Sequence, residues 1–113
     1  CGETNGAPQY SASGGLFGFV RGVKNSKGGR GFIAVTSVAH TKNGPVSKIV
    51  PTLAPGSAIT SLRNDVHFIA TEYGVVDLRW ADIPTRAQRL ISIAHPDFRD
   101  ELTYEAKKLG FLY

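Results

Sequence analysis

An acidic residue at the end of an apolar segment is the first candidate for chemistry. Glu72 follows the mainly apolar, β-prone run Val66–Ala70. A carboxylate at the end of a core strand often faces a cleft, and burial there raises its pKa. The alternative is a surface glutamate that pairs with Arg63 or Arg79, and the pattern alone leaves both interpretations open.

Two further features have the chemistry to bind an anion. The pair Gly14-Gly15 precedes an apolar segment, and backbone N–H groups at a loop-to-helix junction stabilise an oxyanion or a phosphate. The alternative is an ordinary turn. Lys42 lies in a polar segment after a strong strand candidate, where its ammonium group can meet a phosphate as a point charge. Its alternative is a solvated lysine.

Other catalytic classes find little support in the sequence. His40, His67 and His95 lack metal-ligand spacing, and with a single cysteine a zinc site is not expected. Cys1 lies at an open terminus, which is a poor place for a catalytic thiol. Ser11 and Ser13 lack a nucleophile-elbow context, so a serine hydrolase is not expected either.

The size and charge of the chain limit its class. With 113 residues it is long enough for one domain, residues 1–113. It begins at Cys1 and contains no methionine, so we expect it to be part of a longer protein. The formal charge of +4 is dispersed and no nucleic-acid-binding module is evident, so no nucleic-acid partner is expected. A phosphate-bearing small molecule explains the excess charge about as well.

The sequence also predicts a compartment. One cysteine excludes an internal disulfide and is typical of a reducing environment. No run approaches the roughly 20 apolar residues that a membrane-spanning helix needs. We therefore expect a cytoplasmic protein without a membrane partner.

Strands are the first elements that the sequence predicts around these candidate residues. Apolar, β-branched runs predict a buried strand over 32–39, a short strand over 46–51 and a strand that enters a turn over 65–74. Residues 40–45 predict a turn. The apolar run 16–23 is too short for its pattern to separate strand from helix.

Two helices are predicted to close the chain. Pro84 and Pro96 each suit the first turn of a helix, and Gly110 suits the C-terminal end of the second. The apolar positions at helical spacing are Ala87, Leu90, Ile91 and Ala94 in the first helix, and Phe98, Leu102, Ala106 and Leu109 in the second. Strands followed by helices predict an α/β domain with a mixed or parallel sheet covered by helices.

Two long segments carry a resemblance to a known family. "SKIVPTLAPGSAITSLRNDVHFIATEYGVVDLR" and "RAQRLISIAHPDFRDEL" resemble the C-terminal region of the acetyl-CoA hydrolase/transferase family, which includes 4-hydroxybutyrate CoA-transferases. The resemblance covers essentially the whole chain. It implies the C-terminal part of an α/β CoA-transferase-like fold of the NagB/RpiA/CoA-transferase type, with a central sheet covered by helices.

The resemblance also implies a reaction. Coenzyme A, as a substrate and with no metal, would move between an acyl-CoA and a small carboxylic acid. A glutamate would attack the acyl-CoA carbonyl, giving an anhydride and then a glutamyl-CoA thioester. The remaining N-terminal part of the parent enzyme would be a partner, and a homo-oligomer stays open.

Individual residues match the family's motifs. Gly15 matches the glycine whose N–H contributes to the oxyanion hole, and Gly14 lies beside it. Lys42 matches a lysine that binds CoA, and Ser11 falls where some members have an asparagine that contacts CoA. Glu72 matches a second active-site carboxylate in the T-E-x-G motif. We expect Gly15, Lys42 and Glu72 to share one hollow around the thioester.

The chain departs from the family in two ways. Leu16 and Gly18 stand where many members have the glutamine and aspartate of G-G-Q-x-D-F. The nucleophilic glutamate lies well upstream of the glycine pair in the family, and Glu3 is too close to Gly15 to replace it. We therefore expect the nucleophile to lie upstream of this chain, and the chain alone to be inactive.

Three alternatives remain at this point. The departures at Leu16 and Gly18 leave open a non-catalytic CoA-binding or assembly domain. An acyl-CoA hydrolase differs from a transferase mainly in whether water reaches the thioester. A purely structural fragment would expose sheet edges, which invite pairing with another chain.

Overall fold

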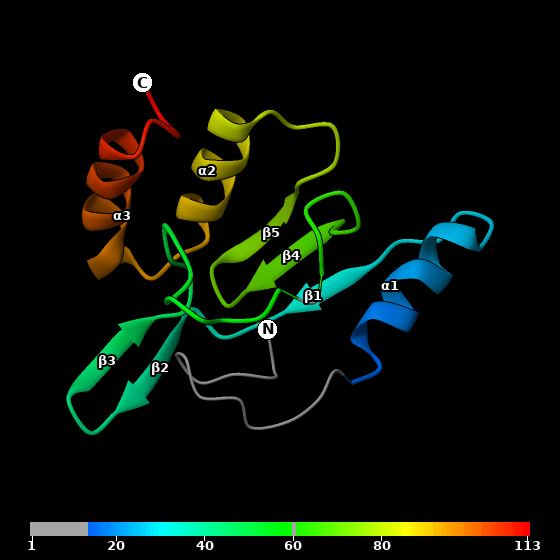
Figure 1. Cartoon of the computed structure of the whole chain (residues 1–113), viewed down its shortest axis with the longest axis horizontal. Helices are drawn as coiled ribbons and strands as arrows, with labels where there is room; N and C mark the ends of the chain where they lie inside the picture. The colour runs from blue at the N-terminus through cyan, green and yellow to red at the C-terminus, as the bar shows by residue number, and fades with distance from the viewer. Residues whose placement is uncertain (1–13, 60) are drawn as a thin grey trace.

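A computed structural model describes residues 14–59 and 61–113 of the chain. Within them lie helices on either side of a small mixed sheet, and a separate hairpin (Figure 1). The elements in chain order are α1 (Leu16–Asn25), β1 (Phe32–Ala34), β2 (Val38–Thr41), β3 (Gly44–Ser47), β4 (Phe68–Thr71), β5 (Gly74–Asp77), α2 (Ile83–Ser92) and α3 (Pro96–Lys108).

The main sheet has the strand order β1-β4-β5. β1 pairs with β4 in parallel, and its last residue, Ala34, is the partner of Ala70. β4 pairs with β5 in antiparallel fashion, with Thr71 opposite Gly74. Glu72 is therefore the first residue of a two-residue turn, which Gly74 completes at a φ of +147°. The predicted strand and turn over 65–74 are confirmed, whereas β5 was not predicted.

The second sheet is the hairpin β2–β3. Its strands pair from Val38 opposite Ser47 to Thr41 opposite Gly44, so the turn predicted over 40–45 is shorter and consists of Lys42 and Asn43. The strand predicted over 46–51 begins earlier, at Gly44, and ends at Ser47. The prediction of one buried strand over 32–39 is wrong. The segment divides into β1 and β2, which belong to different sheets, and the chain between them turns inward at Ser37.

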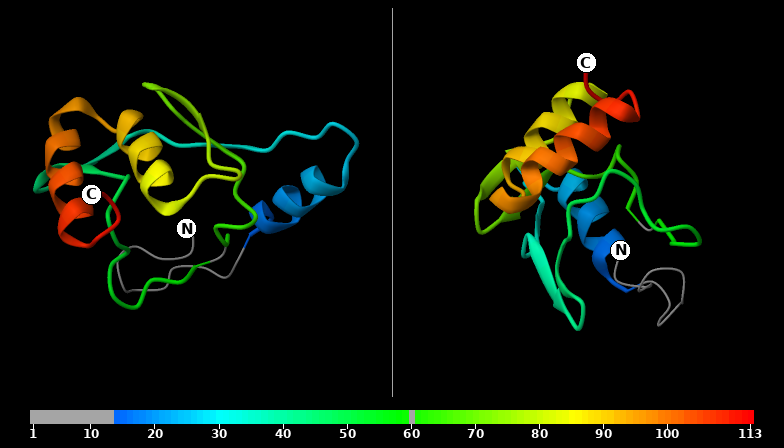
Figure 2. Two further views of the ribbon diagram at one scale, coloured as in Figure 1. Left: turned by 90° about the horizontal axis from the view of Figure 1, so that it is seen from above. Right: turned by 90° about the vertical axis from the view of Figure 1, so that its left-hand side faces the viewer.

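The undecided segment 16–23 is helical. α1 begins after Gly15 and continues to Asn25. Its apolar side chains recur at helical spacing, at Leu16, Phe19, Val20 and Val23, which places them on one face. None of the residues of α1 is buried, and the helix lies beside the end of the sheet farthest from α3 (Figures 1 and 2).

The two predicted C-terminal helices are confirmed. The carboxylate of Asp82 caps α2 by accepting a hydrogen bond from the Thr85 N–H at 2.9 Å. Pro84 lies in the first turn of α2, and α3 begins at Pro96. α3 ends at Lys108, and Gly110 reverses the chain at a φ of +81°.

The core lies between α2, α3 and the end of β5. α2 and α3 pack side by side, and α2 also contacts β5 (Figure 2). Among residues 14–59 and 61–113, the buried apolar side chains are Leu78, Ile93, Ala94, Leu102, Ala106 and Leu112. The predicted α/β class is confirmed, with the packed core at the C-terminal end of the chain.

Candidate functional site

The sheet brings together two segments that lie far apart in the sequence. β1 and β4 are parallel, so both carboxyl ends lie at the same edge of the sheet. The Val35 N–H donates to the Ala70 carbonyl at 2.9 Å and extends the pairing past the end of β1. The chain after β1 consequently runs beside the turn after β4, and Ser37 meets Glu72 there.

Ser37 donates hydrogen bonds to both oxygens of the Glu72 carboxylate. Its backbone N–H lies 3.1 Å from Oε1 and 3.0 Å from Oε2, and its hydroxyl also donates to Oε1. Ser37 is fully buried, with an exposed fraction of 0%, whereas Glu72 is exposed. The carboxylate is therefore held from the protein side and open on the other.

The electrostatics of Glu72 differ from expectation. The Ser37 hydroxyl, the Glu72 N–H and the Ser37 N–H hold the pKa of Glu72 below its ordinary value, against an opposing effect of desolvation. The expected rise through burial is therefore wrong. The alternative of a surface ion pair is also wrong within the part of the chain described, because Arg79 pairs with Asp77 at 3.0 Å and no ion pair involves Glu72.

The turn that carries Glu72 is anchored on the connection between α2 and α3. The Thr71 hydroxyl donates to the Ile93 carbonyl at 2.6 Å. The ring of Tyr73 meets His95 edge to face at a centroid distance of 5.6 Å, and the Arg99 guanidinium lies 5.5 Å from the Tyr73 centroid. His95 adds a smaller electrostatic lowering of the pKa of Glu72.

Gly15 lies where the sequence placed it, at the start of a helix. It is the N-cap of α1, with no side-chain cap, and the first turn contains no acidic residue. The first-turn N–H groups of such a helix lack partners within the helix. Gly15 lines a hollow of about 420 Å³ along α1, together with Gly18, Phe19, Gly22, Val23 and Ser26.

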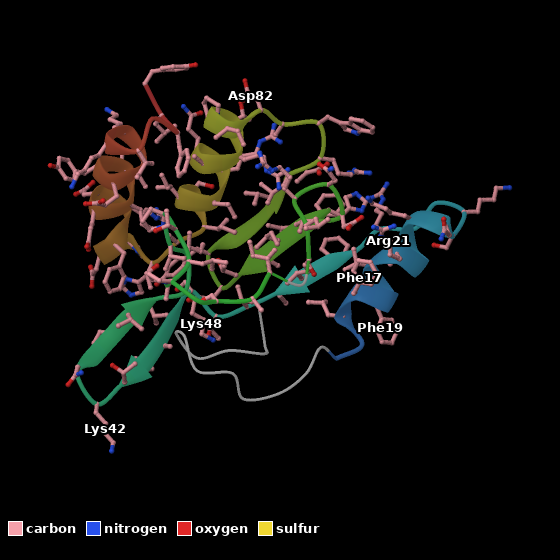
Figure 3. All side chains as sticks on the ribbon, viewed as in Figure 1. Phe17, Phe19, Arg21, Lys42, Lys48 and Asp82 are labelled. Carbon is pink, nitrogen blue, oxygen red and sulfur yellow. The ribbon has the colours of Figure 1, made fainter. Side chains whose placement is uncertain are left out.

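Lys42 lies apart from Gly15 and Glu72. It is exposed at the tip of the β2–β3 hairpin and points away from the rest of the chain (Figure 3). The length of β2, roughly 13 Å for its four residues, separates it from Ser37. The expectation that all three share one hollow is therefore not met, because neither Lys42 nor Glu72 lines the hollow beside Gly15.

The remaining predicted site residues divide into two groups. Gly14 is described and is exposed beside Gly15. Ser11 lies outside the described residues, as do Cys1 and Glu3. The sequence reasoning missed Ser37, although a signal was present, because Thr36-Ser37 is a polar pair inside an otherwise apolar run.

A second hollow, of about 540 Å³, lies between the two C-terminal helices. It is mainly apolar, with Arg63 and Arg86 at its wall, and it contains none of the predicted site residues. The Arg86 guanidinium donates to the carbonyl oxygens of Leu78 and Arg63, at 2.8 and 3.3 Å. Because of these bonds, Arg86 is committed to joining α2 to the loops around it.

Residues 14–59 and 61–113 contain neither a metal-binding cluster nor a helix suited to crossing a membrane. No group of three or more histidine, cysteine, aspartate or glutamate side chains in residues 14–59 and 61–113 lies close enough to hold a metal ion. Within those ranges, no helix combines the length and the apolar character required to cross a membrane.

Fold and site together define an α/β domain that presents a fixed carboxylate at the edge of a mixed sheet. The family model of the acetyl-CoA hydrolase/transferase C-terminal domain matches residues 1–106. The chain therefore belongs to the acetyl-CoA hydrolase/transferase family, as a C-terminal domain, which confirms the predicted membership.

The curated relatives are CoA transferases. The chain is 52% identical over 110 residues to a succinyl-CoA:cyclohexane-1-carboxylate CoA transferase of Geobacter metallireducens, covering 97% of this chain and 25% of the relative. It is 46% identical over 108 residues to a 4-hydroxybutyrate coenzyme A transferase of Clostridium kluyveri, covering 96% and 25%. The chain thus spans about a quarter of the length of these relatives.

Solved structures agree with the sequence comparison. RipA from Yersinia pestis is 49% identical and superposes with a TM-score of 0.82, covering 94% of this chain and 23% of its own. A 4-hydroxybutyrate CoA-transferase from Porphyromonas gingivalis is 40% identical with a TM-score of 0.65, covering 84% and 22%. The predicted CoA-transferase-like α/β fold is confirmed.

Proposed function

We propose that this chain is the C-terminal domain of a CoA transferase that moves coenzyme A between an acyl-CoA and a carboxylic acid. The named activities of the relatives support this class of reaction. The structural observation that carries the proposal is the Glu72 carboxylate, which Ser37 fixes at the sheet edge while its other side stays open.

The proposed reaction begins outside this chain. An upstream glutamate attacks the thioester carbonyl, and the C–S bond breaks to give an anhydride and CoA thiolate. The thiolate then attacks the glutamyl carbonyl, which releases the first carboxylate and leaves a glutamyl-CoA thioester. An incoming carboxylate reverses these steps and leaves with CoA. Each carbonyl attack creates an oxyanion, which the N–H of Gly15 would stabilise.

Glu72 would act as a fixed acceptor in this site. Because its pKa is lowered, it is ionised at neutral pH, and an ionised carboxylate only accepts hydrogen bonds. It would therefore orient N–H or O–H donors of the acyl-CoA, or of the upstream part of the site, beside the thioester. It would not serve as a proton donor.

The separation of Lys42 from Glu72 is compatible with one long ligand. Coenzyme A carries its phosphates and its thiol at opposite ends of an extended molecule. Lys42, at the tip of a hairpin, would meet a phosphate as a point charge while Glu72 meets the acyl end. Lys42 would then contribute to the affinity for CoA, and Glu72 to turnover.

The test is Glu72→Gln in the full-length enzyme, with CoA transfer between an acyl-CoA and acetate as the assay. We expect kcat to fall roughly 100-fold, since a fixed charge at the reacting group is lost. Glu101→Gln removes the same charge from an exposed position on α3 and should leave kcat unchanged. Unchanged turnover in Glu72→Gln would remove Glu72 from the proposed site. Omitting acetate separates transfer from hydrolysis.

A further inference from the structure

We propose that Ser37 is a positioning residue for the reaction, because it sets the orientation of the Glu72 carboxylate at the edge of the sheet. This inference rests on the proposed function, since it assigns a role to Ser37 through Glu72. The family resemblance did not imply a role for Ser37. The role is inferred from the geometry between β1 and β4.

The contact between the two residues is specific. A single residue supplies both a backbone N–H and a hydroxyl, and the N–H is shared between both carboxylate oxygens at 3.1 and 3.0 Å. A carboxylate that is bonded at both oxygens cannot rotate about its terminal torsion without losing a bond. Hydrogen bonds to a charged group are also stronger than those between neutral groups.

Ser37 is itself held in place. Its carbonyl accepts a hydrogen bond from the Lys48 N–H at 2.8 Å, which ties it to the segment after β3. Two residues earlier, the Val35 N–H donates to the Ala70 carbonyl of β4. Because Ser37 is completely buried, solvent does not compete for its two donors. The sheet thus fixes Ser37, and Ser37 in turn fixes Glu72.

The exposed side of Glu72 remains available to a ligand. An ionised carboxylate has about four acceptor positions, and Ser37 takes those on the protein side. His95, in the connection between α2 and α3, also acts on the carboxylate. Loss of the Ser37 hydroxyl should therefore change the pKa of Glu72, since this hydroxyl has the largest effect on that pKa.

The first experiment measures the titration directly. The full-length protein is labelled with ¹³C at its glutamate carboxylates, and Glu72→Gln assigns the signal of Glu72. We expect Ser37→Ala to raise the pKa of Glu72 toward its ordinary value, because the largest stabilising contact of the anion is lost. Ser37→Thr retains a hydroxyl and should restore the lower pKa.

A matched control lies one residue away. Thr36 is exposed, and its hydroxyl donates to the Val38 carbonyl and accepts from Lys48. Thr36→Ala therefore removes a neighbouring hydroxyl without touching Glu72, and it should leave the pKa of Glu72 unchanged. Should Ser37→Ala fail to fold, Ser37→Cys keeps nearly the same volume with a much weaker donor, and it should give the same upward shift.

The second experiment follows the reaction. In Ser37→Ala, the acid limb of kcat/KM should move to higher pH, because Glu72 must be ionised to act. Above that limb, kcat should still be lower by roughly tenfold, since a hydrogen bond that orients a charged group is missing. KM for the carboxylic acid substrate and the profile of Thr36→Ala should stay close to those of the parent.

The outcomes separate this inference from the proposed function. If Glu72→Gln removes turnover while Ser37→Ala changes neither the pKa of Glu72 nor the acid limb, the inference is overturned and the proposed function stands. If Ser37→Ala raises the pKa but neither substitution alters turnover, the proposed role of Glu72 fails, and the role of Ser37 in the reaction fails with it.

Discussion

Trp80 adopts a backbone conformation that its side chain disfavours. It is the one non-glycine residue among those described with a positive φ, at 60°, and its side chain is 99% exposed. The left-handed region costs a residue with a Cβ about 1 kcal/mol or more. Trp80→Gly should therefore stabilise the fold by about 0.5 kcal/mol, after the added entropy of glycine in the unfolded chain is subtracted. Denaturant titration of the two proteins measures the difference.

Trp80→Ala is the control for this prediction. It removes the same exposed indole ring but keeps a Cβ at the same φ, so it should give little or none of the gain. Equal stabilisation by the two substitutions would show that the indole ring, rather than backbone strain, sets the stability at this position. A loss of stability in Trp80→Gly would contradict the prediction outright.

At the residue scale, part of the candidate site was predicted from the sequence and part was not. The position of Glu72, at the end of a strand, was predicted because a β-prone run before a Glu-Tyr-Gly turn is a local signal. Its partner was not, because Ser37 lies 35 positions away in the sequence and reaches Glu72 through the parallel pairing of β1 and β4. Because Ser37 was not predicted as a partner, the direction of the pKa shift of Glu72 was predicted wrongly.

At the scale of elements, α1 depends on one buried carboxylate. Asp65, which is only 4% exposed, lies in the loop before β4 and pairs with Arg21 at 3.1 Å and Lys24 at 3.0 Å. A hollow of about 140 Å³ lies between the apolar face of α1 and β1, so the apolar contacts between this helix and the sheet are incomplete. The ion pairs therefore account for much of the attachment of this helix.

Removing the carboxylate should loosen α1 before it affects the sheet. In Asp65→Asn, we expect faster amide hydrogen exchange over Leu16–Asn25, with exchange in β4 unchanged. The bond from Lys24 is the main reason that the pKa of Asp65 is lowered. A lowered folded-state pKa contributes stability above the unfolded value near 3.9, and this stability is lost as the pH falls through the folded value.

Acid and salt give two further measurements of the same contact. The protection of the α1 amides, taken relative to the intrinsic exchange rate at each pH, should fall in the parent below about pH 4. It should also fall in high salt, because Arg21 and Lys24 are about half exposed and are screened. Asp77→Asn, which breaks the exposed pair with Arg79, is the control and should leave α1 unchanged. Uniform acceleration across the chain would contradict a local role for Asp65.

Elements were predicted best where local rules decide them. α2 and α3 carry proline in the first turn and a capping side chain, and both were found from the sequence. The run 32–39 is mainly apolar, and its one polar pair, Thr36-Ser37, does not by itself show that the chain turns there and divides between two sheets. α1 stayed undecided because a short apolar run fits either period until its contacts are known.

At the scale of the whole molecule, packing is uneven. The buried apolar side chains lie directly after β5 (Leu78), directly after α2 (Ile93 and Ala94), in α3 (Leu102 and Ala106) and in the C-terminal tail (Leu112). At the other end, Phe19 is 78% exposed, and Phe32 is exposed on β1, although its ring stacks on that of Phe68 at 4.7 Å. The outer edge of β1 is unpaired among the described residues. We call α1 and β1 together the open end.

An open end of this kind should associate when the chain is produced by itself. Exposed aromatic side chains beside an unpaired strand edge favour pairing with a second copy. We expect sedimentation velocity to show a weight-average mass that rises with concentration over the micromolar range. Phe19→Ala should reduce this rise, since it removes the most exposed ring of α1 and also favours the helix.

Tyr104→Ala is the matched substitution, because Tyr104 is a helical aromatic residue of similar exposure, 65%, that lies on α3 at the packed end. It changes helix propensity in the same direction and should leave the concentration dependence as it is. Equal effects of the two substitutions would mean that association has no preferred face. A chain that stays monomeric at every concentration would mean that the exposed rings of α1 and β1 are covered in some other way. Because the relatives are about four times as long as this chain, the prediction concerns the chain produced by itself.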